Sequence, residues 1–437
     1  MEKPNILYIH SHDTGRYIQP YGHAIPTANL QKLAEEGVLF RQVYSASSTC
    51  SPSRAALLTG QYPHNNGMLG LAHRGFRLND YNHHIIHTLH NGGYASALAG
   101  FQHIADTFDV PWKAIGYNMY LADAPARETG PYAEENQAHL AALDFLKNRP
   151  PQPFFLSVGL LEAHRQFPPL AQDSNPKYVL PPATLPDTPQ VREDMARFKI
   201  SARNLDSKMG AVIEVLDRYG LAENTLVICT TDHGIAFPAM KCNLTGHGIG
   251  VMLIMRGPGG FSGGKVIDSL VSHIDIFPTV CDLVGIPYPD WLQGVSFMPI
   301  LRGEAQEVRE AIYAEVNYHA AYEPMRCVRT KRWSYIRRFD HRSHPILPNC
   351  DDGPSKTLWL EHGWSELPPP EEALYDLVFD PNERNNLIDD PTMTSVVHEM
   401  RERLGAWMQS TQDPLLHGSV PAPSGAKLDD PGAISPT

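Results

Sequence analysis

Residues 5–43 read NILYIHSHDTGRYIQPYGHAIPTANLQKLAEEGVLFRQV. The apolar run at residues 5–10 is typical of a buried β-strand. Residues 27–37 follow with the apolar spacing of a helix, and Gly37 is a typical helix stop. A second strand pattern begins at once, at residues 38–43. This order of strand, helix and strand predicts a unit of parallel sheet covered by a helix.

The same alternation continues through the first two thirds of the chain. It predicts further elements at residues 85–91 (helix), 94–99 (strand), 134–147 (helix), 154–160 (strand), 191–219 (helix) and 226–230 (strand). We therefore expect an α/β fold in which a large, mostly parallel sheet lies between helices on both faces.

The pattern changes after about residue 310. Short strands are expected at residues 325–329 and 333–338, a proline-rich loop at residues 367–370, and a final helix at residues 394–409. Proline, glycine, serine and aspartate dominate the last part of the chain, which is typical of a mobile tail. The predicted organisation is a large α/β domain at residues 1–310, a smaller α+β domain at residues 311–415, and a tail at residues 416–437.

The composition is that of an ordinary globular protein. The chain has 437 residues, of which 42% are hydrophobic and 19% charged, and it exceeds the roughly 250–300 residues of a single hydrophobic core. A net charge of −12 argues against binding to the phosphate backbone of nucleic acids. The 21 histidines are more than an average chain carries, which directs attention to metal binding and proton transfer.

The six cysteines are irregularly spaced and form no CxxC pair. This spacing predicts neither a disulfide framework nor a zinc ribbon. The first apolar run, at residues 5–9, is too short for a signal peptide or a membrane span. We therefore expect a cytoplasmic protein with reduced thiols and with no membrane or nucleic-acid partner; the oligomeric state stays open.

A motif at residues 50–60, CSPSRAALLTG, is the most informative part of the sequence. Pro52 and the helix-compatible run that ends at Gly60 place Cys50 near the first turn of a short helix. Backbone N–H groups at such a position favour an anion. A buried structural cysteine before a capped helix is the alternative explanation of these residues.

The motif resembles the signature of the sulfatase family, C-x-P-S-R followed by T-G, in which the cysteine is oxidised to Cα-formylglycine. Cys50, Pro52 and Arg54 match the core that the formylglycine-generating enzyme recognises. The family's C-terminal signature is matched at residues 374–377, 380–383 and 386–387. Within the family, the chain is most similar to the N-sulfoglucosamine sulfohydrolase branch, through residues 50–60, 64–68, 154–156 and 232–238. The resemblance implies the fold of the alkaline-phosphatase superfamily.

Polar residues directly follow two of the predicted strands. His12 and Asp13 follow the first strand, and Asp232 and His233 follow the strand at residues 226–230. In open parallel sheets, ligands bind beyond the carboxyl ends of the strands, so these side chains are candidates to hold one divalent cation. Taken singly, each has a structural explanation, because aspartate often caps a helix and histidine is often a hydrogen-bonded structural residue.

The resemblance implies that residue 50 completes this metal site. The family usually presents Asp-Asp at the first position and Asp-Asn at the second, whereas this chain has His12-Asp13 and Asp232-His233. A nitrogen thus replaces an oxygen at both places. Oxygen-rich sites suit Ca²⁺, and imidazole moves the preference toward Mn²⁺, Zn²⁺ or Fe²⁺. We expect one divalent ion, with calcium and manganese as the leading candidates.

The resemblance also implies catalytic roles. Formylglycine at Cys50, hydrated to a gem-diol, attacks sulfur, while Arg54 and Lys241 supply positive charge to the sulfate. His164 protonates the leaving oxygen or nitrogen. His103 takes the proton of the second hydroxyl, so that the aldehyde reforms and sulfate leaves by C–O cleavage.

These residues predict a sulfuric ester hydrolase that releases inorganic sulfate from a sulfate ester or sulfamate of a small molecule or saccharide. Two departures motivate an alternative, because Phe101 replaces the family's lysine two residues before His103 and because His233 resembles a residue of phosphonate hydrolases. A phosphonate monoester or phosphodiester hydrolase with the same site is therefore the first alternative. A non-catalytic protein that binds sulfated glycans, with Cys50 unmodified, is the second.

Overall fold

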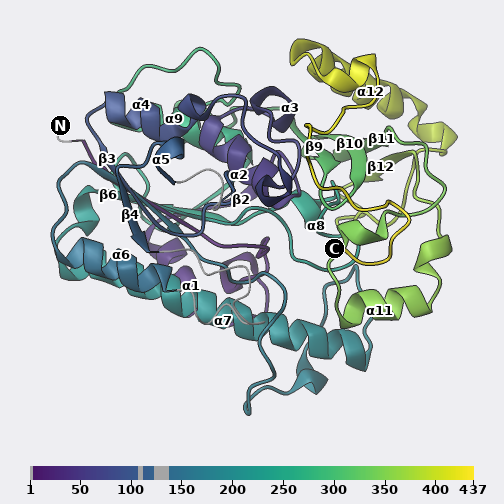
Figure 1. Cartoon of the computed structure of the whole chain (residues 1–437), viewed down its shortest axis with the longest axis horizontal. Helices are drawn as coiled ribbons and strands as arrows, with labels where there is room; N and C mark the ends of the chain where they lie inside the picture. The colour runs from purple at the N-terminus through teal and green to yellow at the C-terminus, as the bar shows by residue number, and fades with distance from the viewer. Residues whose placement is uncertain (1–2, 107–111, 123–136) are drawn as a thin grey trace.

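The computed structural model describes residues 3–106, 112–122 and 137–437. Its larger part is an eight-stranded sheet between layers of helices (Figure 1). The strands of this sheet are β1 (Asn5–His10), β2 (Val38–Tyr44), β3 (Ala95–Gly100), β4 (Met119–Ala122), β5 (Phe154–Gly159), β6 (Thr225–Thr230), β7 (Leu253–Arg256) and β8 (Lys265–Ser272).

The strands lie in the order β4-β3-β5-β1-β6-β7-β2-β8. β1 pairs in parallel with both β5 and β6, and Leu7 is aligned with Leu156 on one side and Val227 on the other. β7 is antiparallel to its neighbours β6 and β2, and the other pairings along the sheet are parallel. The mostly parallel sheet that the sequence predicts is thereby confirmed.

Alternate side chains of β1 point into two separate apolar cores. Ile6 and Tyr8 pack with α2 (Cys50–Thr59), α4 (Ile85–Asn91) and α9 (Ile276–Val284). Leu7 and Ile9 pack with α1 (Ala28–Glu36), α6 (Ala138–Lys147) and α7 (Pro189–Arg218). Because both faces of the strand are covered, β1 is apolar almost throughout, as parallel strands are. Shorter helices in the connections are α3 (Pro63–Asn66), α5 (Trp112–Ile115), α8 (Gly246–Ile249) and α10 (Met298–Leu301).

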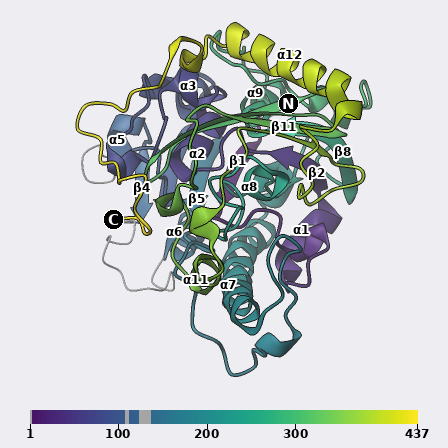
Figure 2. The same cartoon turned by 90° about the vertical axis from the view of Figure 1, so that its right-hand side faces the viewer.

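The C-terminal part of the chain forms a second, antiparallel sheet, in the order β12-β11-β10-β9. Its strands are β9 (Ile312–Tyr318), β10 (Tyr322–Arg329), β11 (Trp333–Arg338) and β12 (Glu372–Asp376). Helix α12 (Thr394–Ser410) lies across this sheet (Figure 2), and α11 (Pro354–Glu361) lies beside α7. This arrangement confirms the smaller α+β part of the predicted fold. The predicted boundary at residue 310 falls just before β9.

Two details differ from the sequence-based expectations or lie outside their reach. The helix expected at residues 134–147 begins at Ala138, and residues 134–136 lie outside the described residues. The tail is anchored by Asp429, whose Oδ1 lies 3.1 Å from Nη1 of Arg74; its predicted mobility stays a prediction. Within the described residues, none of the helices combines the length and the apolar composition needed to cross a bilayer.

Candidate active site

Two neighbouring strands bring the predicted metal ligands to one edge of the large sheet. β1 and β6 are parallel, so the residues that follow them leave the sheet on the same side. The backbone N–H of Asp13 donates to Oδ1 of Asp232 at 2.9 Å. Asp13 has a φ of 48°, in the left-handed region that aspartate tolerates better than most residues. The turn after β1 therefore brings Asp13 directly beside Asp232.

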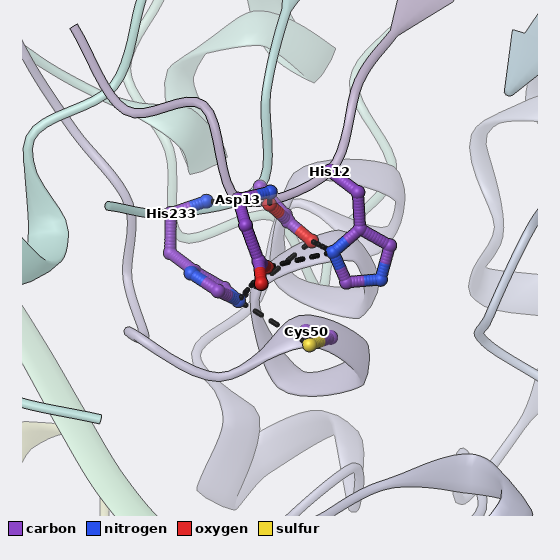
Figure 3. A group of neighbouring side chains, drawn as sticks. His12, Asp13, Cys50 and His233 are labelled. Atoms are coloured by element: carbon purple, nitrogen blue, oxygen red, sulfur yellow. Dashed lines mark hydrogen bonds and ion pairs between the residues drawn. The ribbon is translucent and has the colours of Figure 1, made fainter. Parts of the chain in front are cut away.

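Five potential ligand atoms lie within 4.8 Å of one another at this edge. They belong to His12, Asp13, Cys50, Asp232 and His233, all buried. Figure 3 labels four of these residues, His12, Asp13, Cys50 and His233. Nδ1 of His12 lies 2.7 Å from Oδ1 of Asp13 and 3.1 Å from Oδ2 of Asp232. Nε2 of His233 lies 3.3 Å from Sγ of Cys50 and 3.3 Å from Oδ1 of Asp13. The structure thus brings together the five residues that the sequence analysis assigns to one metal.

The chemistry of this donor set fits a divalent cation. Two carboxylates offer hard oxygen donors, and two imidazoles offer nitrogen donors. Burial lowers the pKa of His12 to about 4, so its imidazole is neutral near pH 7, as a metal ligand must be. Burial alone would raise the pKa of Asp13, but the ammonium of Lys241 holds it well below its usual range. The carboxyl group is therefore ionised.

Helix α2 carries Cys50 to the cluster and is buried along its whole length. Nη2 of Arg54 donates to Oδ2 of Asp232 at 2.9 Å and to the carbonyl oxygen of Ser11 at 2.8 Å. The hydroxyl of Ser53 donates to the carbonyl oxygen of Asp232 at 2.5 Å. These contacts hold the first turn of α2 against the residues that follow β1 and β6. Burial raises the pKa of Cys50 well above its usual range, so the unmodified side chain is a neutral thiol.

Lys241 joins the cluster to a loop from the C-terminal part of the chain. Its Nζ donates to Oδ2 of Asp13 at 2.9 Å and lies 2.8 Å from Oδ2 of Asp351. Burial alone would lower the pKa of Lys241, but Asp13 and Asp351 raise it well above its usual range, which keeps the ammonium charged. The sequence analysis missed Asp351. Its loop, between β11 and α11, has neither a motif nor a periodic pattern that could have identified it.

The two histidines with predicted proton-transfer roles lie next to the ligand cluster. Nε2 of His164 is 3.9 Å from Oδ2 of Asp13, and the His164 side chain is 38% exposed. The ring of His103 lies 5.8 Å from the ring of His12, centre to centre. Burial lowers the pKa of His103 well below its usual range, so this imidazole is neutral. Its Nε2 is 3.0 Å from Nδ1 of His73, a contact that the sequence analysis did not anticipate.

Phe101 forms an aromatic wall beside the cluster. Its ring centre lies 5.4 Å from that of His12 and 5.5 Å from the guanidinium carbon of Arg54. The side chain therefore places a cation–π contact, rather than a further positive charge, on this side of the site. Nε of Arg54 is buried and has no hydrogen-bond partner in the described part of the chain. An unpaired, charged N–H group of this kind is suited to an oxygen of a bound anion.

Comparison with known proteins places this geometry in a family. A family model described as Sulfatase matches residues 4–286. The chain belongs to the sulfatase family. A second model, described as the C-terminal region of N-sulphoglucosamine sulphohydrolase, matches residues 241–356. The resemblance seen in the sequence is confirmed, and the protein is a sulfuric ester hydrolase.

Two relatives match nearly the whole length of this sulfatase. N-sulphoglucosamine sulphohydrolase from Homo sapiens is 28% identical over 478 residues, covering 94% of this chain and 91% of that protein. An ulvan-active sulfatase from Formosa agariphila is 27% identical, covering 94% of this chain and 76% of that protein.

Solved structures show the same fold. A structure described as a complex with its substrate D-glucosamine-2-N,6-O-disulfate superposes with a TM-score of 0.71 and 18% identity, covering 94% of this chain and 99% of that chain. The phosphonate monoester hydrolase of Agrobacterium radiobacter superposes with a TM-score of 0.70 and 21% identity, covering 95% of this chain and 97% of that chain. At these identities, the likeness concerns the fold alone.

Proposed function

We propose that this sulfatase releases inorganic sulfate from a sulfate ester or sulfamate of a saccharide, using one divalent cation and a formylglycine formed from Cys50. One observation carries the proposal: Cys50 begins a buried helix and lies within the cluster of two carboxylates and two imidazoles. The human relative named N-sulphoglucosamine sulphohydrolase, and the matching C-terminal family model, support a sulfated amino sugar or a related saccharide as the substrate.

The cation would be held by His12, Asp13, Asp232 and His233, next to residue 50. When bound, it would supply Lewis acidity toward a sulfate oxygen and lower the pKa of a neighbouring hydroxyl group. The mixture of carboxylate and imidazole donors accommodates both calcium and manganese. Formylglycine would supply, through its hydrated aldehyde, a hydroxyl nucleophile that the neutral thiol of Cys50 does not provide.

The chain's own residues supply binding and proton transfer. Arg54 and Lys241 are each held by carboxylates, and their remaining N–H groups would bind the sulfate oxygens. His164, at the exposed side of the cluster, would protonate the leaving oxygen or nitrogen, a role that is worth about 10²–10⁴-fold in rate. His103 is neutral and would accept a proton as the sulfate is released.

A phosphonate monoester hydrolase is the second candidate. The imidazole of His233 in the ligand cluster favours it, as does the aromatic Phe101 where a further cation would bind a sulfate oxygen. Both candidates use the same nucleophile and the same cation, so they differ in the preferred substrate rather than in the architecture of the site.

Parallel assays separate the candidates. Protein produced together with a formylglycine-generating enzyme is assayed with p-nitrophenyl sulfate, p-nitrophenyl phosphate and a phosphonate monoester. We expect the highest kcat/KM for the sulfate, and an intact mass about 18 Da below that of the unmodified chain. Cys50→Ala is the matched control and should show neither turnover nor that mass change. The highest kcat/KM for the phosphonate would overturn the proposal in favour of the second candidate.

An unmodified mass together with no turnover would instead favour the remaining alternative, a non-catalytic protein that binds sulfated glycans with Cys50 unmodified. We also propose that the protein works in the cytoplasm, which the six free, buried cysteines support. Detection of the protein outside the cytoplasm by cell fractionation would contradict that location.

A further inference from the structure

We propose that Asp351 determines substrate specificity by accepting a hydrogen bond from a hydroxyl or amino group of the leaving group. The inference rests on the proposed function and deepens it, because it names a feature that the substrate must carry. That feature is an O–H or N–H donor close to the sulfated oxygen or nitrogen.

Asp351 reaches the site on the side of His164. Oδ2 of Asp351 lies 2.8 Å from Nζ of Lys241, which lies 2.9 Å from Oδ2 of Asp13. Nε2 of His164 lies 3.9 Å from that same oxygen of Asp13. Burial alone would raise the pKa of Asp351, but Lys241 and then His164 hold it well below its usual range. The ionised carboxylate therefore borders the place where His164 would meet the leaving group.

The carboxylate of Asp351 keeps room for a ligand. Lys241 is the one cation within ion-pair distance of it in the described part of the chain, and the Asp351 side chain is 16% exposed. A carboxylate offers about four acceptor positions, so a single ion pair leaves most of them unused. Lys241 has three N–H donors: one is donated to Asp13, and the ammonium also pairs with Asp351, which leaves at least one donor for an oxygen of the sulfate.

The loop around Asp351 is held by buried polar contacts on both sides. Oδ1 of Asn349 accepts from the backbone N–H groups of residues 320–321 at 2.9 Å each. Nζ of the buried Lys356 donates to the carbonyl oxygen of Cys350 at 2.7 Å. A carboxylate fixed in this way discriminates between substrates, because it cannot move away from one that lacks a donor.

The chemistry of the carboxylate indicates what it recognises. A carboxylate repels an anion and accepts hydrogen bonds without donating them. Beside a sulfate-binding lysine, Asp351 therefore favours a leaving group with a hydroxyl or amino donor and disfavours a plain aryl or alkyl group. Sites built to bind a substrate hydroxyl reject analogues that lack it, because their buried polar groups are then left unpaired. Hydroxylated and aminated saccharides satisfy this requirement.

The test compares trans-2-hydroxycyclohexyl sulfate with cyclohexyl sulfate, which differ by one hydroxyl group. The wild-type enzyme should prefer the hydroxylated compound by about 10- to 100-fold in kcat/KM, the range for hydrogen bonds to charged groups. Asp351→Ala should abolish this preference. Asp351→Asn, of nearly equal size, keeps an acceptor and should retain part of it. With trans-2-aminocyclohexyl sulfate, Asp351→Asn should lose about tenfold, because the attraction between ammonium and carboxylate is gone.

Asp352→Asn is the matched control. Asp352 lies in the same loop and pairs with Lys356, and its side chain is 56% exposed. This variant should keep the wild-type preference for the hydroxylated compound.

Two results would contradict the inference. Equal losses of kcat/KM on the two cyclohexyl sulfates in Asp351→Ala or Asp351→Asn would show that Asp351 acts solely by holding Lys241, and would overturn the inference. Equal kcat/KM of the wild-type enzyme for the two cyclohexyl sulfates would also overturn the inference. If the wild-type enzyme hydrolysed neither the cyclohexyl sulfates nor p-nitrophenyl sulfate, the proposed function itself would be overturned.

Discussion

His164 differs from the buried histidines of the site because its imidazole is partly exposed and can contact a leaving group. General-acid catalysis matters most when the leaving group is a poor one. We therefore expect His164→Ala to lower kcat for an alkyl sulfate by about 10²–10⁴-fold and to lower kcat for p-nitrophenyl sulfate far less. Steady-state rates for the two substrates, measured where chemistry is rate-limiting, provide the check. Equal losses on both would remove His164 from this role.

Asp232 connects the ligand cluster to Arg54, so its removal should affect metal content as well as turnover. Asp232→Ala deletes one donor and leaves the buried guanidinium of Arg54 without its carboxylate. Loss of a residue that is hydrogen-bonded to a metal ligand typically lowers metal affinity by roughly 10–100-fold. We expect a larger loss here, because a ligand itself is removed. Elemental analysis after dialysis measures this without reference to activity. Asp80→Ala, at an exposed carboxylate, should retain metal; full occupancy in Asp232→Ala would contradict the ligand assignment.

The residues of the site were predictable from the sequence to different degrees. His12 and Asp232 directly follow recognisable strands, and Cys50 belongs to a motif, so local patterns identify them. Asp351 and His73 lie in segments without such patterns, and their positions depend on how distant loops pack. Sequence spacing cannot report these contacts, because a loop residue has no periodicity that ties it to a particular edge of the sheet.

At the level of the elements, β5 ends at a glycine because the neighbouring segment leaves no room for a side chain. A Cβ atom at Gly159 would lie 1.8 Å from the carbonyl oxygen of Phe101. Gly159→Ala should therefore displace the segment that carries Phe101 and His103. We expect the free energy of unfolding to fall by about 1–3 kcal/mol, and kcat for p-nitrophenyl sulfate to fall with it. Urea denaturation and the sulfatase assay measure the two effects.

Gly405, in α12, is the matched control for this substitution. No atom outside the adjacent backbone of the helix lies within 4 Å of a Cβ placed there, and the residue is helical. Gly405→Ala should raise the free energy of unfolding by about 0.4–1 kcal/mol, because alanine favours the helix and restricts the unfolded chain. Its kcat should equal that of the wild type. If Gly159→Ala matched the wild type in stability and kcat, the close approach would have no role in placing His103.

Long elements were easier to predict than short ones. The amphipathic pattern at residues 191–219 corresponds to α7, because a helix of this length repeats its apolar face many times. β7 has four residues, and nothing local in Leu253–Arg256 indicates that it lies antiparallel between β6 and β2. Its place depends on partners far away in the sequence, which explains why the sequence analysis missed it.

For the whole molecule, a shared apolar cluster joins the two sheets. Tyr44 and Leu270 of the large sheet pack with Ile312, Val316 and Met325 of the small one. Alternating strand and helix patterns predicted the large part of the fold, and short strands with a final helix predicted the small part. Neither pattern could predict this contact, because the burial pattern of a strand does not identify the surface that covers it. The contact matters for the site, since the C-terminal part of the chain must be held firmly for its loop to reach Lys241.

A buried ion pair links the small sheet to the turn after α12, and it should make stability depend on pH. Nε and Nη2 of Arg326, which is fully buried, donate to Asp413 at 2.5 and 2.9 Å. Burial alone would raise the pKa of Asp413, but Arg326 holds it below its usual range. Since the folded pKa lies below that of the unfolded chain, about 3.9, the stabilisation is complete above that value. It is lost as the pH falls through the folded value.

Asp413→Asn should therefore lower the free energy of unfolding at pH 7 by about 3 kcal/mol, because it leaves the charge of Arg326 less well compensated in the interior. Glu315, 3.7 Å from Arg326, remains as a partial partner and limits the loss. The difference from the wild type should begin to shrink below about pH 4, where Asp413 protonates in the unfolded chain, and should shrink further as the pH falls through the folded value. Urea denaturation at pH 7 and at pH 4 or below measures both. Asp268→Asn, at an exposed carboxylate of β8, should stay close to the wild type. A difference between Asp413→Asn and the wild type that is constant with pH would show that shape, rather than charge, stabilises this contact.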